Sequence, residues 1–120
     1  TGAAGGIGIA IARELLQRGA HVLLTGRSAA RLQQLAAQLA QYGDRINVHP
    51  ADLAVDAERT ALVESAARWR GGIDALINNA GLNDLALLDS QDAAQIDRML
   101  DTNLRAPIQL CRALLPQLRR

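Results

Sequence analysis

TGAAGGIG, residues 1–8, is a glycine-rich stretch that leads directly into an apolar pattern at helical spacing, formed by Ile7, Ile11 and Leu15. Glycine tolerates positive φ, and it lets backbone N–H groups approach a ligand without an intervening Cβ. A helix that begins in such a turn points its partial positive charge at an anion. The stretch therefore predicts a pyrophosphate-binding turn, and a glycine-rich turn that binds nothing is the alternative.

Downstream of this turn, short apolar runs alternate with amphipathic helical patterns. The predicted order is a helix over residues 7–19, a strand over 21–25, a helix over 28–43, a strand over 46–49, a helix over 56–71, a strand over 73–77, and helices over 90–100 and 101–118. Gly19 and Gly43 are the expected helix ends, and Ser28 and Asp56 the expected N-caps. Strands separated by helices of about a dozen residues imply right-handed crossovers and a parallel sheet. We predict the α/β class, with a doubly wound, Rossmann-like sheet covered on both faces.

Composition excludes several classes of function. The chain has 120 residues and a formal net charge of +1, which favours neither nucleic acid nor an anionic membrane as a partner. No apolar run reaches the roughly 18 residues of a membrane span. The single Cys111 rules out an internal disulfide and indicates a cytoplasmic location. No metal site is predicted.

Four motifs follow one another along the chain: T-G-x-x-x-G-x-G at residues 1–8, Asp52-Leu53, Asn78-Asn-Ala-Gly81, and Asn103 in the next long helix. With the alternating pattern, they make the chain resemble the short-chain dehydrogenase/reductase family, in its compact single-domain branch. The resemblance covers essentially all 120 residues. It implies a nicotinamide dinucleotide lying across the carboxyl ends of the strands.

The resemblance also implies which residues contact that coenzyme. The Asp52 carboxylate would accept a hydrogen bond from the adenine amine, although an Asp that only caps a turn is the alternative. Asn79 would brace the sheet through the Thr1 hydroxyl. The implied coenzyme-binding residues are Gly2, Gly6, Ile7, Gly8, Arg27, Ser28, Asp52, Leu53, Asn79, Ala80 and Gly81.

The second strand decides between NAD and NADP. NAD enzymes place an acidic residue about 20 residues past the glycine turn, but this chain has none between Glu14 and Asp44. Arg27 stands there instead, and with Ser28 it can bind a 2′-phosphate. A solvated arginine is the alternative, and residues 3–5 lack the second basic residue that many NADP-preferring relatives carry. We predict NADP(H) as the coenzyme, with NAD possible.

The family reaction is hydride transfer between nicotinamide and a carbonyl or alcohol, with a Tyr-x-x-x-Lys pair as the proton donor system. Only Asn103, the implied catalytic residue of the proton relay, has a counterpart here. Tyr42 is the only tyrosine, Ile46 follows it four residues later, and the chain contains no lysine. We therefore expect residues 1–120 to be a partial dinucleotide-binding domain, which lacks the first strand and the C-terminal strands and is inactive alone.

For the complete protein we predict an oxidoreductase that acts on a small carbonyl or secondary alcohol. A sugar-nucleotide epimerase or dehydratase and a non-catalytic dinucleotide sensor or scaffold are the alternatives. The resemblance also implies a homodimer or homotetramer built through the long helices. The apolar side chains of that helix fit such an interface or burial within the subunit: Ile108, Leu110, Cys111, Leu114 and Leu115.

Overall fold

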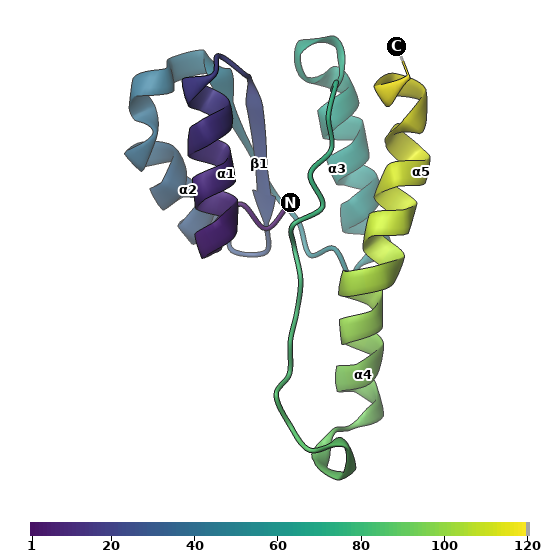
Figure 1. The fold of residues 1–120 in the computed structure, drawn as a ribbon. Helices are drawn as coiled ribbons and strands as arrows, with labels where there is room; N and C mark the ends of the chain where they lie inside the picture. Colours follow the sequence, from purple (N-terminus) through teal and green to yellow (C-terminus); the bar gives the residue numbers. More distant parts are fainter. Residues whose placement is uncertain (120) are drawn as a thin grey trace.

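A computed structural model describes residues 1–119 of the chain (Figure 1). Two strands and five α-helices follow one another along it: α1 (Gly6–Gln17), β1 (Val22–Gly26), α2 (Ala29–Gln38), β2 (Ile46–Pro50), α3 (Asp56–Arg68), α4 (Ala93–Leu100) and α5 (Ala106–Leu118). Short 3₁₀ turns and one π-helical turn join some of them. None of the helices in this part of the chain combines the length and apolarity needed to cross a bilayer.

The two strands pair in parallel, with Val22 opposite Ile46 and Gly26 opposite Pro50. Helix α2 makes the crossover between them, so the predicted βαβ arrangement is confirmed for this unit. Parallel pairing brings the carboxyl ends of both strands to the same edge of the sheet. Residues 27–28 and 51–53, which follow these ends, are thereby placed side by side.

Local signals fixed two of the predicted helix boundaries. Gly19 lies just past the end of α1 with φ 90°, and the amides of Gly19 and Ala20 donate to the carbonyls of Leu16 and Leu15. This pattern closes the helix at the predicted glycine. Ser28 is the N-cap of α2, where its hydroxyl accepts a hydrogen bond from the amide of Arg31 at 3.3 Å.

Two other boundary predictions were wrong. Helix α2 ends at Gln38 rather than near Gly43, which lies inside a following 3₁₀ turn with φ 57°. Val55, not Asp56, is the N-cap of α3, and it caps without a side-chain hydrogen bond. Asp56 is the first residue of the helix, and its carboxylate pairs with the guanidinium of Arg59 one turn later. Asp56 lies one residue inside the helix, so its side chain is past the capping position.

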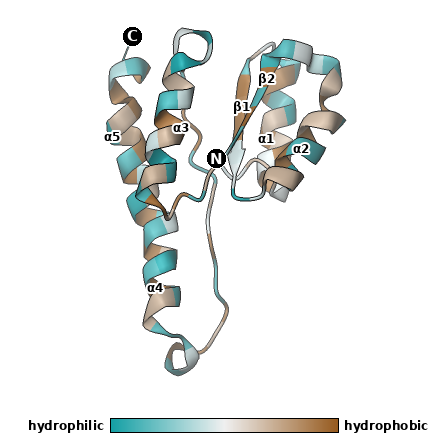
Figure 2. Cartoon of the chain, turned by 180° about the vertical axis from the view of Figure 1, so that it is seen from behind, coloured by the Kyte–Doolittle hydropathy of each residue, from teal (hydrophilic) through white to brown (hydrophobic). Residues whose placement is uncertain are grey.

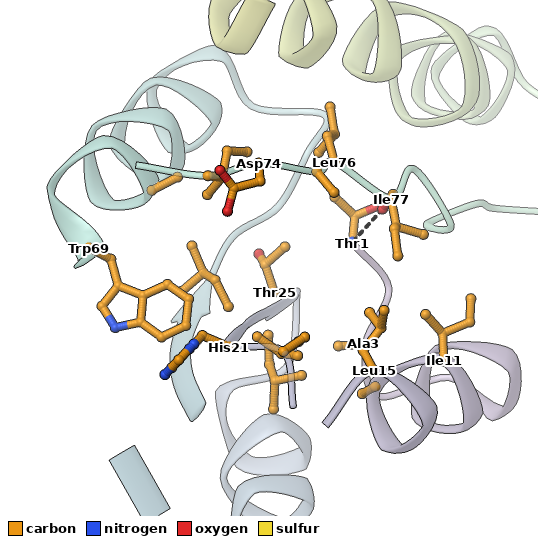
Figure 3. Close-up of a pocket in the computed structure, with 18 of the residues that line it drawn as sticks. Thr1, Ala3, Ile11, Leu15, His21, Thr25, Trp69, Asp74, Leu76 and Ile77 are labelled. Carbon is orange, nitrogen blue, oxygen red and sulfur yellow. Dashed lines mark hydrogen bonds between the residues drawn. The ribbon is translucent and has the colours of Figure 1, made fainter. Parts of the chain in front are cut away.

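The predicted strand over residues 73–77 is also not formed: among the described residues, the sheet has two strands. A strand needs a hydrogen-bonded neighbour, and a groove of about 480 Å³ separates this segment from β1 (Figure 3). Apolar side chains such as Ile11, Leu15 and Leu76 line the groove. The N-terminal amine and the hydroxyl of Thr1 both donate to the carbonyl of Ile77, at 2.7 and 3.2 Å.

Two clusters of buried side chains flank this groove. The first joins α1 and α2 to β1 through Leu16, Leu24 and Leu32. The second joins α3 to α5 through Leu62 and Leu110. Figure 2 shows hydrophobic colour concentrated in β1 and on parts of the helices, and each cluster packs such faces together. The two clusters hold the sheet edge and the long C-terminal helices on either side of the N-terminal turn.

Helices α4 and α5 are joined by a π-helical turn, Asp101–Arg105, into one long helical segment (Figure 1). Its N-cap is Asp92, whose side chain forms a reciprocal capping box with Gln95, and its first helical residue, Ala93, comes three residues later than the predicted start at Ser90. Pro107 stands in the first turn of α5 and cannot donate a backbone hydrogen bond. The π-helical turn shortly before Pro107 is a local irregularity of this segment, in which i→i+5 hydrogen bonds replace the usual i→i+4 bonds.

Candidate coenzyme site

A cavity of about 570 Å³ opens at the carboxyl edge of the sheet. Four segments that are far apart in the sequence meet around it: the glycine turn, the residues after β1, the residues after β2, and residues 79–82. The cavity lining includes every residue that the sequence implied for coenzyme binding: Gly2, Gly6, Ile7, Gly8, Arg27, Ser28, Asp52, Leu53, Asn79, Ala80 and Gly81. The structure therefore brings all eleven together, and their role toward a coenzyme stays a prediction.

The glycine turn combines backbone packing that only glycine allows with a helix start that is exposed to the cavity, as an anion site requires. Gly2 has φ 63°, and a Cβ on it would lie 2.9 Å from the Cα of Ala80. A Cβ on Gly8 would lie 2.1 Å from the carbonyl oxygen of Gly2, so the turn needs glycine at both positions. A Cβ on Gly6 would meet nothing within 4 Å, because the first residue of α1 faces open space. The backbone at the helix start is thus exposed to the cavity, which fits a pyrophosphate.

Asn79 ties the glycine turn to the segment after residue 77. Its amide donates to the Thr1 hydroxyl at 3.0 Å, and its side-chain Nδ2 donates to the carbonyls of Thr1 and Gly2 at 3.2 and 3.3 Å. The amide of Ala80 shares the same hydroxyl at 3.0 Å. The expected contact between Asn79 and Thr1 is present, and it holds two walls of the cavity at a fixed separation.

Positive charge gathers where β1 ends and α2 begins. Arg27 is exposed and makes no hydrogen bond or ion pair with any described residue, although it lines the cavity. Arg31, one turn into α2, also lines the cavity, and its Nη2 donates to the carbonyl of Ala4 in the glycine turn at 2.6 Å. The first turn of α2 contains no acidic residue. This corner of the cavity is therefore cationic.

Asp52, in the neighbouring segment after β2, is held by three contacts. Its Oδ1 accepts from the amide of Ala54 at 3.0 Å, its Oδ2 accepts from Nη2 of Arg98 at 2.5 Å, and its own amide donates to Glu58 at 2.6 Å. Partial burial raises the pKa of the Asp52 carboxyl, but the Ala54 amide, the paired Arg98 and the charge of Arg27 outweigh burial, so the pKa is lowered. The carboxylate is a fixed, ionised hydrogen-bond acceptor.

Leu53, the residue after Asp52, is held in position by a buried arginine on α3. Arg59 on α3 is 5% exposed and donates to the Leu53 carbonyl while it pairs with Asp56. Burying a guanidinium costs free energy unless it is paired and hydrogen-bonded, and Arg59 satisfies both conditions. It anchors the turn that carries Asp52 and Leu53 to the start of α3.

Asn103 lies outside the cavity lining, but its side chain clamps the segment that borders it. Its Oδ1 accepts from the amide of Leu82 at 2.7 Å, and its Nδ2 donates to the Leu82 carbonyl at 2.6 Å. Its neighbour Thr102 lines the cavity, is 5% exposed, and has a hydroxyl that bonds to no described residue. An orphaned buried hydroxyl at the wall also fits a polar ligand in the cavity.

Sequence reasoning missed several residues of this site. Arg31 and Thr102, which line the cavity, and Arg98, which pairs with Asp52, belong to helical segments, and their places at the site depend on how those segments pack. Arg31 alone carried a usable signal, because it follows Arg27 by four residues at a helix start where cations are otherwise unfavourable. Arg59 lies on α3, and its charge alone would suggest a solvent-exposed side chain, whereas the structure buries it.

A parallel βαβ unit with a glycine turn opening a helix, and a cavity at the carboxyl ends of its strands, defines a dinucleotide-binding α/β domain of the Rossmann type. The chain belongs to the short chain dehydrogenase family, whose family model matches residues 1–120.

Known proteins agree with this assignment. Nodulation protein G of Rhizobium sp. (strain N33) is 43% identical over 121 residues, which cover 100% of this chain and 48% of that protein. L-sorbose reductase from Gluconobacter frateurii, solved with NADPH and L-sorbose, superposes with a TM-score of 0.91 at 32% identity, covering 98% of this chain and 45% of that one. A short-chain dehydrogenase from Sphingobium yanoikuyae, solved with NADPH, gives a TM-score of 0.86 at 35% identity, over 97% and 46% of the two chains. The chain spans about half the length of these relatives.

Proposed function

We propose that the full-length protein is an NADP(H)-dependent oxidoreductase that acts on a small carbonyl compound or secondary alcohol. The observation that carries the proposal is the unpaired, exposed Arg27 at the cavity edge, beside Ser28, in a segment after β1 that contains no acidic residue. NADPH complexes among the similar structures support it. When bound, the coenzyme supplies the hydride, and the residues of this chain bind and orient it.

Each wall of the cavity has a part in that binding. The amides at the start of α1 face the pyrophosphate, and the exposed side chain of Ile7 covers the same region. The ionised Asp52 accepts a hydrogen bond from the adenine amine, while Arg27 and Ser28 meet the 2′-phosphate. Asn103 fixes Leu82 beside the cavity and takes the relay role that the family resemblance implies.

The NADP(H) preference is tested by Arg27→Gln in the full-length protein, with Kd values for NADPH and NADH measured by calorimetry. Charge-assisted hydrogen bonds to a phosphate are worth about tenfold to a hundredfold in affinity. NADPH binding should weaken by that factor while NADH binding stays within about twofold. Equal losses for the two coenzymes would show that Arg27 does not read the 2′-phosphate.

We further propose a homodimer or homotetramer that uses α4 and α5. The structure divides the predicted apolar face, because Leu110 and Leu114 are buried inside the chain, whereas Ile108 and Leu115 remain 58% and 40% exposed. Leu104, one turn earlier than Ile108, is also 58% exposed. This smaller patch is the proposed contact, and sedimentation of the full-length protein tests it. The cytoplasmic location indicated by Cys111 also stays a prediction.

A further inference from the structure

Arg31 stands at the meeting point of two elements of the coenzyme cavity. It belongs to α2, but its guanidinium reaches across to the glycine turn and donates to the carbonyl of Ala4 at 2.6 Å. The turn itself carries no basic residue at positions 3–5. Arg31 thus brings a cation onto the turn from outside, into the corner of the cavity that Arg27 and Ser28 also line.

The local electrostatics of this corner are unfavourable without an anion. The N-terminus of a helix carries a partial positive charge, and cations near it destabilise the helix. Here Arg27 precedes the Ser28 cap and Arg31 lies in the first turn, with no acidic residue in that turn. Among the described side chains, Asp52 is the carboxylate that also lines this cavity; its charge attracts Arg27, but its ion pair is with Arg98. A ligand with two negative charges would satisfy both arginines and the helix end together.

The hydrogen bond to Ala4 leaves Arg31 with donors to spare. A guanidinium has five N–H groups in a planar fork, and the carbonyl of Ala4 takes one of them. That bond also fixes the side chain, so less conformational entropy is lost when a ligand binds. Arg31 is therefore held in place at the cavity with free donors.

We propose that Arg31 is a specificity-determining residue, the second cation of the site that recognises the 2′-phosphate of NADP(H). The inference rests on the proposed function, because it assigns a second ligand to the phosphate that Arg27 is proposed to bind. Arg31 supplies from α2 the charge that residues 3–5 do not supply. The glycine turn and α2 are then bridged twice, by the Ala4 carbonyl and by the phosphate.

The test uses the full-length protein and two probes that differ by the phosphate alone, 2′,5′-ADP and 5′-AMP, with calorimetry as the readout. Arg31→Gln should weaken 2′,5′-ADP binding about tenfold and leave 5′-AMP binding within about twofold. Arg31→Lys should recover part of the loss, because it restores the charge but not the planar fork. Arg18→Gln is the matched control: it removes the same charge from an exposed arginine that pairs with Glu14 away from the cavity.

The pH dependence gives a readout that a bracing role would not move. A phosphate monoester gains its second charge near pH 6, so the preference for 2′,5′-ADP over 5′-AMP should rise between about pH 5.5 and 7.5. Arg31→Gln should flatten this rise. Equal losses for both probes would overturn the inference and leave Arg31 as a brace of the glycine turn, and no loss for either would overturn it outright.

Failure of the inference and failure of the proposed function give different results. If Arg27→Gln weakens both probes equally, the NADP(H) preference itself fails, whatever Arg31 does. If Arg27→Gln discriminates between the probes and Arg31→Gln does not, the coenzyme assignment stands and only the role of Arg31 is lost. Thermal melting of each variant shows whether it is folded. If Arg31→Gln does not fold, the comparison of the two probes is made with Arg31→Lys instead.

Discussion

Nη2 of Arg98 lies 2.5 Å from Oδ2 of Asp52, so an ion pair ties α4 to the turn that follows β2. The two residues are 46 positions apart in the sequence. The pair fixes a carboxylate on the wall of the coenzyme cavity, and it connects that wall to the helical segment that ends in the π-turn with Asn103. Asp52 thus links the proposed adenine side of the cavity to α4.

Replacing Arg98 with methionine should raise the pKa of Asp52 toward its ordinary value, because Arg98 contributes both a hydrogen bond and a positive charge. A carboxyl whose folded-state pKa is lowered stabilises the fold above its unfolded pKa. That contribution is lost as the pH falls from about 4 through the folded-state value. Carbon-13 NMR titration of Asp52 in the full-length protein measures the shift directly.

The same variant should weaken NADPH and NADH by the same factor, about threefold to tenfold, since adenine is common to both coenzymes. This separates Arg98 from Arg27 and Arg31, whose loss should affect NADPH alone. Arg68→Met is the control, because Arg68 forms an exposed pair with Glu64 on α3, at 3.6 Å. An unchanged Asp52 pKa in Arg98→Met would show that the ion pair does not persist in solution.

Two glycines of the opening turn offer a matched pair of substitutions with opposite consequences. Gly8→Ala should destabilise the protein by about 3 kcal/mol, because its Cβ would lie 2.1 Å from the Gly2 carbonyl oxygen and the backbone must move. Gly6→Ala should keep or slightly raise the melting temperature, since alanine is the better helix former and its Cβ meets nothing at this first residue of α1.

Coenzyme binding should separate the two positions further. The methyl group in Gly6→Ala would project into open space at the start of α1, where the pyrophosphate is proposed to lie, so NADPH affinity should fall at least about tenfold in a fully folded protein. Thermal melting and calorimetry on the same samples give both numbers. Full NADPH affinity in Gly6→Ala would place the phosphates elsewhere.

The chain pattern was sufficient to predict the parallel βαβ unit and the convergence of three motifs, the glycine turn, Asp52-Leu53 and Asn78-Asn-Ala-Gly81, on one cavity. Ser28 and Gly19 acted as local signals, so they were readable from the sequence. The irregular conformation of residues 73–77 was not readable from the sequence. An apolar run becomes a strand only beside a hydrogen-bonding neighbour, and a groove lies between this segment and β1. The ion pair of Arg98 with Asp52 depends on tertiary packing between segments far apart, which no local pattern encodes.

Thr102 predicts a change whose effects on stability and on binding have opposite signs. Its hydroxyl is buried without a hydrogen bond to any described residue, which costs about 1 kcal/mol or more. Thr102→Val keeps the shape and removes that hydroxyl, so the coenzyme-free protein should become more stable. NADPH binding should weaken about threefold to tenfold if the hydroxyl contacts the ligand. Melting curves with and without NADPH reveal the reversal, and a variant that is less stable in both states contradicts it.

Asn103 gives the last prediction, because its side chain makes two hydrogen bonds to the backbone of one residue, Leu82. Asn103→Ala removes both and should cost about 1–2 kcal/mol locally, which corresponds to about tenfold faster hydrogen exchange at the Leu82 amide. Asn103→Asp keeps an acceptor for that amide but sets a carboxylate oxygen against the Leu82 carbonyl.

The two variants separate bracing from a part in the proton relay. If Asn103 only holds Leu82, kcat in the full-length enzyme should fall in proportion to the rise in the exchange rate at the Leu82 amide. Asn103→Asp should then lie between the wild type and Asn103→Ala in both measurements. If Asn103 takes part in the proton relay, kcat should instead fall in both variants by more than the exchange data predict. KM for NADPH should stay nearly unchanged, because Asn103 does not line the coenzyme cavity. Unchanged exchange at Leu82 in Asn103→Ala would contradict the clamp itself.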